Sequence, residues 1–222
     1  MKNLHNALLL KQLSILKQMG YNYTDIKPSN LQMQDIMQLP NSFSALKDTA
    51  LNCHLCELSK HRRNVVFGEG NIQADIMFVT EGPGMGEDST GEPISGHARE
   101  MLNNMIEKVL LIPASDVYIS NIVKCRAPNN RMATETEIYT CRPYLQKEIK
   151  FVKPKIIVTL GATAYRYLTN DSTSISKVRG GIIEMGGYRL IPTLHPNYLL
   201  RNPSAKKEVM NDILKVKELL NR

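Results

Sequence analysis

The sequence predicts an α/β protein with a mostly parallel sheet that is covered by helices on both faces. One observation is that short apolar runs, bounded by polar residues, alternate along the chain with longer segments of helical periodicity. A second is a glycine-rich loop, Thr80–Gly96, that directly follows one of these runs. Ligands of α/β proteins usually bind at loops that leave the carboxyl ends of strands, so this loop marks the expected site.

The apolar runs are predicted as strands. They are Ala74–Val79, Asp116–Val123, Lys155–Leu160 and Tyr188–Pro192. Val178–Met185 is predicted to pair with the last of them in a hairpin, because the two-glycine segment 186–187 between them is typical of a tight turn.

The helical segments lie between the strands. They are His97–Val109, a helix from Thr134 to about Lys150, Gly161–Leu168 and Ser204–Leu220. Thr134 and Glu137 have the spacing of a capping box. The loop Thr80–Gly96 is expected to be neither helix nor strand, because it contains four closely spaced glycines and two prolines. The alternative for this loop is a purely structural turn.

The first part of the chain differs from the rest. Residues 2–19 carry apolar side chains at helical spacing, and residues 21–45 are polar with the character of a linker that contains a short helix, Leu31–Leu39. We therefore expect a helical extension in residues 1–48, which packs on the sheet or binds another protein. Residues 49–222 form the expected main domain.

Composition limits the class of protein. The formal net charge of +7 and the pI of about 9.2 suggest a polyanionic partner. Basic clusters at residues 60–63, 124–131 and 177–179 could meet phosphates or form a solvated surface. No apolar run approaches the roughly 20 residues of a membrane span, and no signal-peptide cleavage site is evident, so a cytoplasmic protein without a membrane partner is expected.

The chain has four cysteines, Cys53, Cys56, Cys125 and Cys141. Disulfides are rare in the cytoplasm, and a C-x-x-C pair followed by two further cysteines favours a four-thiolate metal site. Zinc and an iron–sulfur cluster are both compatible with four thiolates. The alternative is a set of unrelated buried thiols.

Several motifs together resemble the iron–sulfur (family 4) uracil-DNA glycosylases. They are the glycine loop, the segment ISNIVKCRAPNNR, the cysteine spacing and the late LHPNYLLR, and they extend from about Cys53 to Arg201. The resemblance implies a three-layer αβα fold with a central, mostly parallel four-stranded sheet. It implies a [4Fe–4S] cluster on the four cysteines, with zinc as the alternative occupant. It also implies a monomer that flips uracil out of DNA and cleaves the N-glycosidic bond, leaving an abasic site.

The resemblance assigns roles to individual residues. His195 resembles the histidine that stabilises negative charge at uracil O2, and its alternative is a structural histidine before proline. Asn121 resembles the residue whose amide reads the uracil edge. Glu87 resembles the residue that closes the pocket against the thymine methyl group. Glu81 and Gly82 hold the first positions of the motif, and Glu81 is the candidate for placing the attacking water.

The resemblance also predicts contacts with DNA. Tyr198 or Leu199 would fill the gap left by the flipped base, and Arg201 would hold a phosphate. Arg62 and Arg63, in the first basic cluster, are further candidates for phosphate contacts.

One position departs from the family pattern. The family usually has a stacking phenylalanine where this chain has Ile94, and a base stack is worth roughly 1–3 kcal/mol. Loss of catalysis is therefore one alternative, in a uracil-DNA-binding protein that does not cleave or that traps its product. Trapping relatives carry a histidine in a basic loop, and residues 126–140 contain none. A metal-stapled DNA-binding module is the other alternative, and it leaves Asn121 and His195 without a role.

Overall fold

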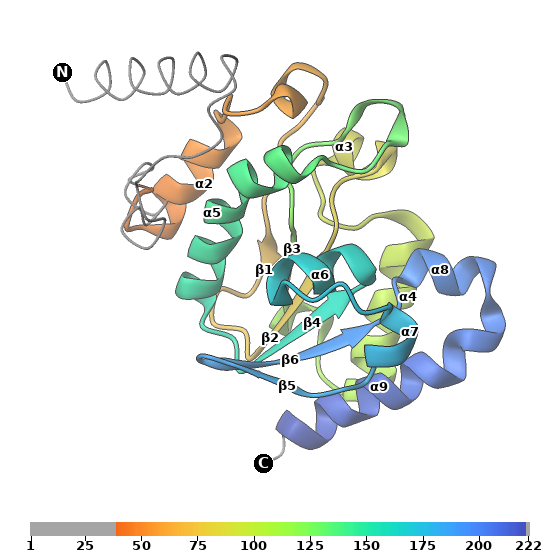
Figure 1. Cartoon of the computed structure of the whole chain (residues 1–222). Coiled ribbons are helices and arrows are strands. Elements are labelled where there is room, and N and C mark those ends of the chain that lie inside the picture. The colour runs from red at the N-terminus through yellow and green to blue at the C-terminus, as the bar shows by residue number, and fades with distance from the viewer. Residues whose placement is uncertain (1–38, 221–222) are drawn as a thin grey trace, which may run out of the picture. The chain divides into compact units, whose positions relative to one another are not determined.

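The computed structural model describes residues 39–220, and these residues belong to one compact unit that begins at Leu39 (Figure 1). The helix expected in residues 2–19 and most of the short helix predicted at 31–39 lie outside the described residues. The N-terminal extension and its boundary at residue 48 therefore stay predictions, although helix α2, Phe43–Leu51, spans that position. None of the described helices is both long enough and apolar enough to cross a membrane.

The described chain alternates between helices and strands, as predicted. In order the elements are α2 (Phe43–Leu51), η3 (Glu57–Lys60), β1 (Glu69–Gly70), β2 (Ile76–Thr80), α3 (Met85–Thr90), α4 (Gly96–Met105), η4 (Ile106–Leu110), η5 (Ala114–Asp116), β3 (Tyr118–Asn121), η6 (Pro128–Asn130), α5 (Glu135–Val152), β4 (Ile156–Leu160), α6 (Ala162–Thr169), α7 (Ile175–Val178), β5 (Ile183–Met185), β6 (Tyr188–Thr193), α8 (Pro196–Arg201), η7 (Pro203–Ala205) and α9 (Lys206–Leu220).

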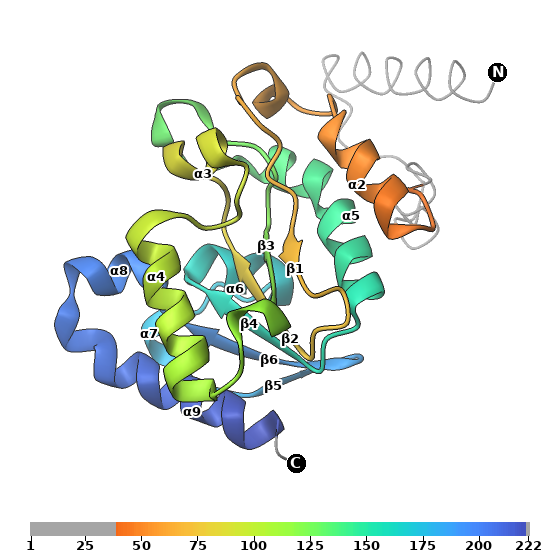
Figure 2. The ribbon, with the colours of Figure 1, turned by 180° about the vertical axis from the view of Figure 1, so that it is seen from behind.

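Six strands form one sheet in the order β1-β3-β2-β4-β6-β5 (Figure 2). The four inner strands are parallel, which confirms the predicted central sheet. Strands β1 and β5 are short and antiparallel to their neighbours, and they cover the two edges. The chain runs from β2 to β3 on one side and later enters β4 on the other side of β2. The boundary between β2 and β4 is therefore the topological switch point, where ligands bind in open α/β sheets.

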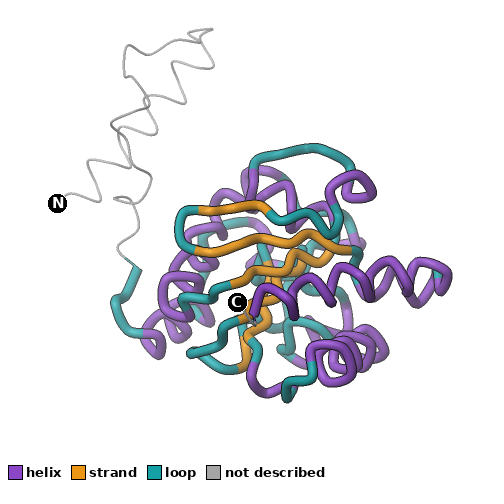
Figure 3. Tube along the Cα trace, turned by 90° about the horizontal axis from the view of Figure 1, so that it is seen from below, coloured by secondary structure: helices purple, strands orange, loops and turns teal. Residues whose placement is uncertain are grey.

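Side chains of the inner strands alternate between two apolar layers. Ile76 and Phe78 pack in the layer that includes residues of α4, η4, α8 and α9. Met77 and Val79 pack in the opposite layer with residues of α5 and α6. Figure 3 shows helices on both sides of the strands. The three-layer αβα architecture is confirmed, and burial of both sheet faces explains why these strands are continuous apolar runs.

The glycine loop differs from its prediction because it contains the short helix α3. The Glu87 carboxylate accepts a hydrogen bond from the Gly84 N–H at 3.0 Å, which satisfies a donor at the start of this helix. The predicted capping box at the start of α5 is confirmed. The Thr134 N–H donates to the Glu137 carboxylate at 2.8 Å, and the Glu137 N–H donates to the Thr134 hydroxyl at 3.3 Å.

The predicted hairpin is shorter than expected. Its turn and second strand are present, but only Ile183–Met185 pairs with β6, and Val178 ends helix α7. The chain then turns at Gly180, whose φ of +66° suits glycine. The apolar pattern alone did not reveal this turn.

Candidate active site

A cavity of about 300 Å³ lies at the carboxyl ends of the parallel strands. It is formed by the chain that follows β2, β3 and β6, so three separate segments converge on it. Its lining residues are Thr80, Glu81, Gly82, Pro83, Gly84, Glu87, Pro93, Ile94, Val123, Cys125, Arg126, Ala127, Arg131, Ala133, His195 and Asn197. Five residues predicted to act on or contact uracil are among them, together with the predicted metal ligand Cys125, and this placement agrees with the rule for switch points.

Glu81 follows β2 and is half-buried at the edge of the cavity. Its Oε2 atom accepts a hydrogen bond from the Thr163 hydroxyl at 2.8 Å. Thr163 lies in α6, which follows β4, so this bond crosses the switch point between β2 and β4. The bond fixes one carboxylate oxygen of Glu81.

Gly82 permits a close approach between the first two segments of the cavity. A Cβ atom at this position would lie 2.5 Å from Cγ2 of Val123, which also lines the cavity. A larger residue would therefore require the Val123 side chain or the loop that carries it to shift.

Glu87 joins the two ends of the glycine loop. Besides its bond to Gly84, it accepts hydrogen bonds through Oε1 from the Ser95 N–H at 3.0 Å and the Ser95 hydroxyl at 2.7 Å. Its carboxylate therefore serves the shape of the loop as well as lining the cavity. The role predicted for Glu87 against the thymine methyl group stays a prediction.

Ile94 and Asn121 occupy buried positions. The Ile94 side chain is 2% exposed, lines the cavity and belongs to the core beside α4. Asn121 ends β3, and its side chain is completely buried. In the described part of the chain, neither its Oδ1 nor its Nδ2 atom has a hydrogen-bond partner. A buried polar group left unpaired costs about 1–3 kcal/mol, which marks this amide as a group awaiting a ligand. Its strand neighbour Thr80 lines the cavity.

His195 is the N-cap residue of α8. Its Nδ1 atom accepts a hydrogen bond from the Asn197 N–H at 3.1 Å, so the proton of the neutral ring is on Nε2. Burial lowers the pKa of His195 to about 4, with Glu87 opposing this shift and Arg201 adding to it. At neutral pH the ring is therefore an uncharged donor at Nε2.

The residues of helix α8 that were predicted to touch DNA differ in their exposure. Tyr198 is 48% exposed and Arg201 is exposed as well. Leu199 is completely buried in the core beside α4. The prediction that Leu199 fills the gap left by a flipped base is therefore not supported, because its position on the helix turns it inward. Leu200, on the outer side, is 41% exposed.

The first basic cluster divides into two roles. Arg62 donates a hydrogen bond from Nη1 to the Cys125 sulfur at 3.3 Å, which places it at the cysteine cavity. Arg63 has an exposed side chain and stays a candidate for a phosphate contact. Its backbone N–H donates to the buried Asp88 carboxylate of α3 at 2.9 Å. Asp88 thus connects the cysteine segment to the glycine loop.

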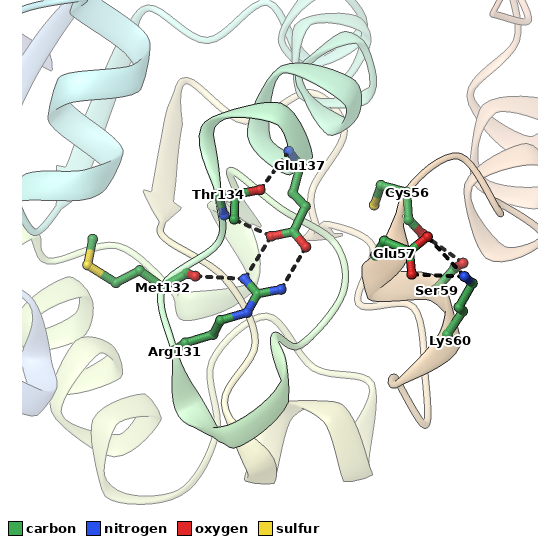
Figure 4. A network of polar contacts seen from close by, with 8 residues as sticks. All are labelled: Cys56, Glu57, Ser59, Lys60, Arg131, Met132, Thr134 and Glu137. Carbon is green, nitrogen blue, oxygen red and sulfur yellow. Dashed lines mark hydrogen bonds and ion pairs between the residues drawn. The ribbon is translucent and has the colours of Figure 1, made fainter. Parts of the chain in front are cut away.

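Two residues of the second basic cluster are engaged inside the protein. Lys124 is 2% exposed and pairs with the buried Glu148, so it does not offer its charge to phosphates. Arg131 forms a bidentate pair with the Glu137 carboxylate, with N–O distances of 2.8 and 2.7 Å, and also donates to the Met132 carbonyl at 2.9 Å (Figure 4). The Arg131 bonds lower the pKa of Glu137 to about 2. These bonds hold in place the segment that contributes Arg131 and Ala133 to the lining of the cavity.

All four cysteines line a second, small cavity of about 20 Å³. Its other lining residues include Leu55, Leu58 and Val65, which give it apolar walls. The Lys124 N–H donates to the Cys141 sulfur at 3.3 Å, in addition to the Arg62 bond to Cys125. Such donors stabilise thiolate ligands.

The four thiols are a donor set of the kind that binds zinc or an iron–sulfur cluster. Among residues 39–220, no three His, Cys, Asp or Glu side chains have the spacing that a single metal ion needs. Burial raises the pKa of Cys141 to about 12 and also raises the pKa of Cys56 and Cys125. A metal group that binds here must therefore displace protons. The donor set, four thiols that line one small cavity, is compatible with the cofactor that the sequence predicts.

Sequence reasoning missed Thr163, Ser95 and the bonds of Arg131. Thr163 follows β4, so the switch-point rule, combined with the strand order, would have indicated a residue near this position. The bonds of Ser95 and Arg131 depend on how the loops fold, and no spacing in the sequence signals them.

Comparison with known proteins agrees with this geometry. The model of the family described as "Uracil DNA glycosylase superfamily" matches residues 67–215. A type-4 uracil-DNA glycosylase of Thermotoga maritima is 45% identical over 174 residues, which cover 77% of this chain and 90% of that protein. A type-4 uracil-DNA glycosylase of Saccharolobus solfataricus is 41% identical over 189 residues, which cover 82% of this chain and 88% of that protein. The predicted family is confirmed, and this chain belongs to the uracil DNA glycosylase superfamily.

Proposed function

We propose that this protein is a uracil-DNA glycosylase that acts in DNA repair. It binds uracil-containing DNA, receives the flipped uracil in the cavity after β2, and hydrolyses the N-glycosidic bond. The observation that carries the proposal is the completely buried, unpaired amide of Asn121 at the strand end beside a cavity that also holds Glu81 and His195. The identity of 41–45% to type-4 uracil-DNA glycosylases supports the same activity.

The reaction places opposite demands on the two ends of the bond. When the bond between N1 and C1′ breaks, its electron pair leaves with uracil, and the charge spreads to the O2 atom. The uncharged Nε2–H donor of His195 stabilises this charge without first giving up a proton. Water then adds its hydroxyl to C1′. The Glu81 carboxylate, held by Thr163, orients the water and accepts its other proton.

The Asn121 amide supplies selectivity for the base. Its Oδ1 atom accepts the N3–H of uracil and its Nδ2 donates to O4. Cytosine reverses both groups, so each contact would bring together two donors or two acceptors. Ile94 presents an apolar surface to the base, and Glu87 restricts the space beside C5.

Contacts outside the cavity hold the DNA. Arg63 and Arg201 are exposed cations that bind phosphates, and Tyr198 is the exposed residue of α8 that fills the gap in the duplex. These contacts raise affinity for any DNA, whereas the cavity selects the damaged base.

The four cysteines hold a [4Fe–4S] cluster. Four cysteine thiolates are the usual ligands of such a cluster, and all four cysteines line the same small cavity. When bound, the cluster ties the segment 53–63 to α5 and to the chain after β3. Through the bond between Arg63 and Asp88, the same segment supports α3 and the cavity wall.

The activity is tested with a duplex oligonucleotide that contains one uracil. After incubation with the purified full-length protein, alkali should cleave the strand at the uracil position. Matched duplexes with cytosine or thymine should remain intact, and His195→Ala should release uracil far more slowly while still binding. Binding of uracil-containing DNA without any cleavage would contradict the enzyme and favour a non-catalytic binding protein.

A further inference from the structure

The side chain of Lys124 is buried between the two candidate sites. It is 2% exposed, although lysine is almost never fully buried unless it is paired. Its ammonium group pairs with the Glu148 carboxylate and donates to the Ser120 hydroxyl at 2.6 Å and the Asn121 carbonyl at 3.0 Å. These contacts use all three donors that an ammonium group offers.

Glu148 carries the other half of this buried network. It is completely buried in α5 and accepts hydrogen bonds at 2.9 Å from the Gly68 N–H, the Tyr118 hydroxyl and the Ser120 hydroxyl. Burial and the Glu148 charge raise the pKa of Tyr118, so its hydroxyl stays a donor. A Cβ atom on Gly68 would lie 2.3 Å from Glu148 Oε1, so the backbone approaches the carboxylate closely. Both charged groups of the network are therefore fully paired.

One peptide group beside the cavity is fixed at both ends. The carbonyl of Asn121 accepts the Lys124 bond, and the N–H of Ile122 in the same peptide group donates to the Thr80 carbonyl at 2.9 Å. The Asn121 amide itself has no partner among residues 39–220. The position from which the side chain projects is therefore set by this peptide group.

The backbone of Lys124 is anchored as well. Its N–H donates to the Cys141 sulfur at 3.3 Å, and its carbonyl accepts from the Val66 N–H at 2.7 Å. The ammonium group thus connects a fixed point beside the cysteine cavity to the peptide that carries the Asn121 amide.

We propose that Lys124 is a positioning residue for Asn121, and that its bond to the Asn121 carbonyl sets the discrimination between uracil and cytosine. The proposal rests on the proposed function, in which the Asn121 amide reads the base. If the buried ion pair had a purely structural role, removing it would lower stability and would weaken binding of every DNA ligand alike. A positioning residue instead acts through Asn121, and its effect disappears when the amide is absent.

The test is a double-mutant cycle on binding. The variant Lys124→Met combined with Glu148→Gln removes both charges together, so that no unpaired charge is left buried. Oligonucleotides with a single 2′-fluorinated, non-cleavable deoxyuridine or deoxycytidine serve as probes. The measured quantity for each protein is the Kd for the deoxycytidine probe divided by the Kd for the deoxyuridine probe, so a smaller ratio means weaker discrimination.

We expect the double variant to reduce this ratio by about 10-fold in the wild-type background and by less than about 2-fold in an Asn121→Ala background. Tyr118→Phe is the matched control, because it removes one bond to Glu148 and leaves the Lys124–Asn121 contact in place. It should lower stability without changing the ratio. Ser120→Ala, which removes one partner of the ammonium group, should change the ratio in the same direction by a few-fold and provides the test if the double variant does not fold.

An equal reduction in both backgrounds, or an unchanged ratio in the double variant and in Ser120→Ala, would overturn the proposal. Loss of the metal group through the neighbouring Cys125 would act in both backgrounds and is therefore separated from positioning. Uracil release is measured on cleavable DNA in parallel. A wild-type protein that binds the uracil probe selectively but releases no uracil would refute the proposed activity and leave the test of Lys124 intact.

Discussion

The low pKa of His195 makes the pH dependence of uracil release a sharp test of the site. Burial moves this pKa from the ordinary 6.5 to about 4. Because the folded-state value is depressed, the neutral ring remains the main form until the pH falls through about 4. We therefore expect the contribution of His195 to the rate to stay constant across the neutral and mildly acidic range.

The size of the effect follows from the shift. At pH 6.5 an ordinary histidine is half protonated, whereas a pKa of about 4 leaves the neutral ring in excess by about 300 to 1. The folded protein also binds fewer protons here than the unfolded chain. The stability that His195 contributes is therefore present above about pH 6.5 and is lost as the pH falls toward 4.

The assay is single-turnover release of uracil from about pH 8 to about pH 4.5, for the wild type and for His195→Ala. The ratio of the two rates cancels pH effects on DNA and on other residues, and we expect it to be flat. Loss of the His195 donor should itself cost about 2.7–4 kcal/mol of barrier, or about 100- to 1,000-fold in rate. A ratio that changes with a midpoint near 6.5, or an assigned His195 ring signal in NMR that titrates there, would refute the reasoning.

Three further predictions concern other parts of the site. Ile94→Phe should tighten binding of uracil-containing DNA by at most about 1–3 kcal/mol, with less effect on the chemical step, and weaker binding in single-turnover titrations would show that Ile94 does not cover the base. Purified protein should be brown, with broad absorbance at about 400 nm, and Cys125→Ala should lose both colour and thermal stability. A colourless anaerobic preparation with stoichiometric zinc would argue for zinc. Tyr198→Ala should weaken DNA binding at unchanged melting temperature, and Leu199→Ala should destabilise the fold by about 2–5 kcal/mol in denaturant titrations. The opposite pattern would show that Leu199, not Tyr198, faces DNA.

Much of the fold could be predicted because both faces of the inner sheet are covered. A strand such as Ile156–Leu160 is then apolar along its whole length and stands out from its polar surroundings. Edge strands carry a weaker signal, and the two-residue β1 is too short to show any pattern. Helix α3 was missed because its capping bonds come from the side chain of Glu87 and outweigh the poor helix propensity of its glycine.

The candidate site was predicted less completely, because residue type does not fix direction. Leu199 and Tyr198 are neighbours, and only the rotation of α8 decides that one is buried and the other is exposed. Lys124 and Arg62 carry charges that suggest a surface role. Their partners, Glu148 and Cys125, are distant in sequence and become visible only once the chain is folded.

The residues proposed to act on uracil follow three different strands: Glu81 comes after β2, Asn121 ends β3 and His195 comes after β6. No hairpin or single helix contains two of them, so closing the site requires long loops to be ordered first. A nascent chain that has not yet added β6 to the sheet lacks the donor for the leaving base, so it should release uracil far more slowly than the folded protein. A fast rate of cleavage therefore reports that all three strands have joined the sheet.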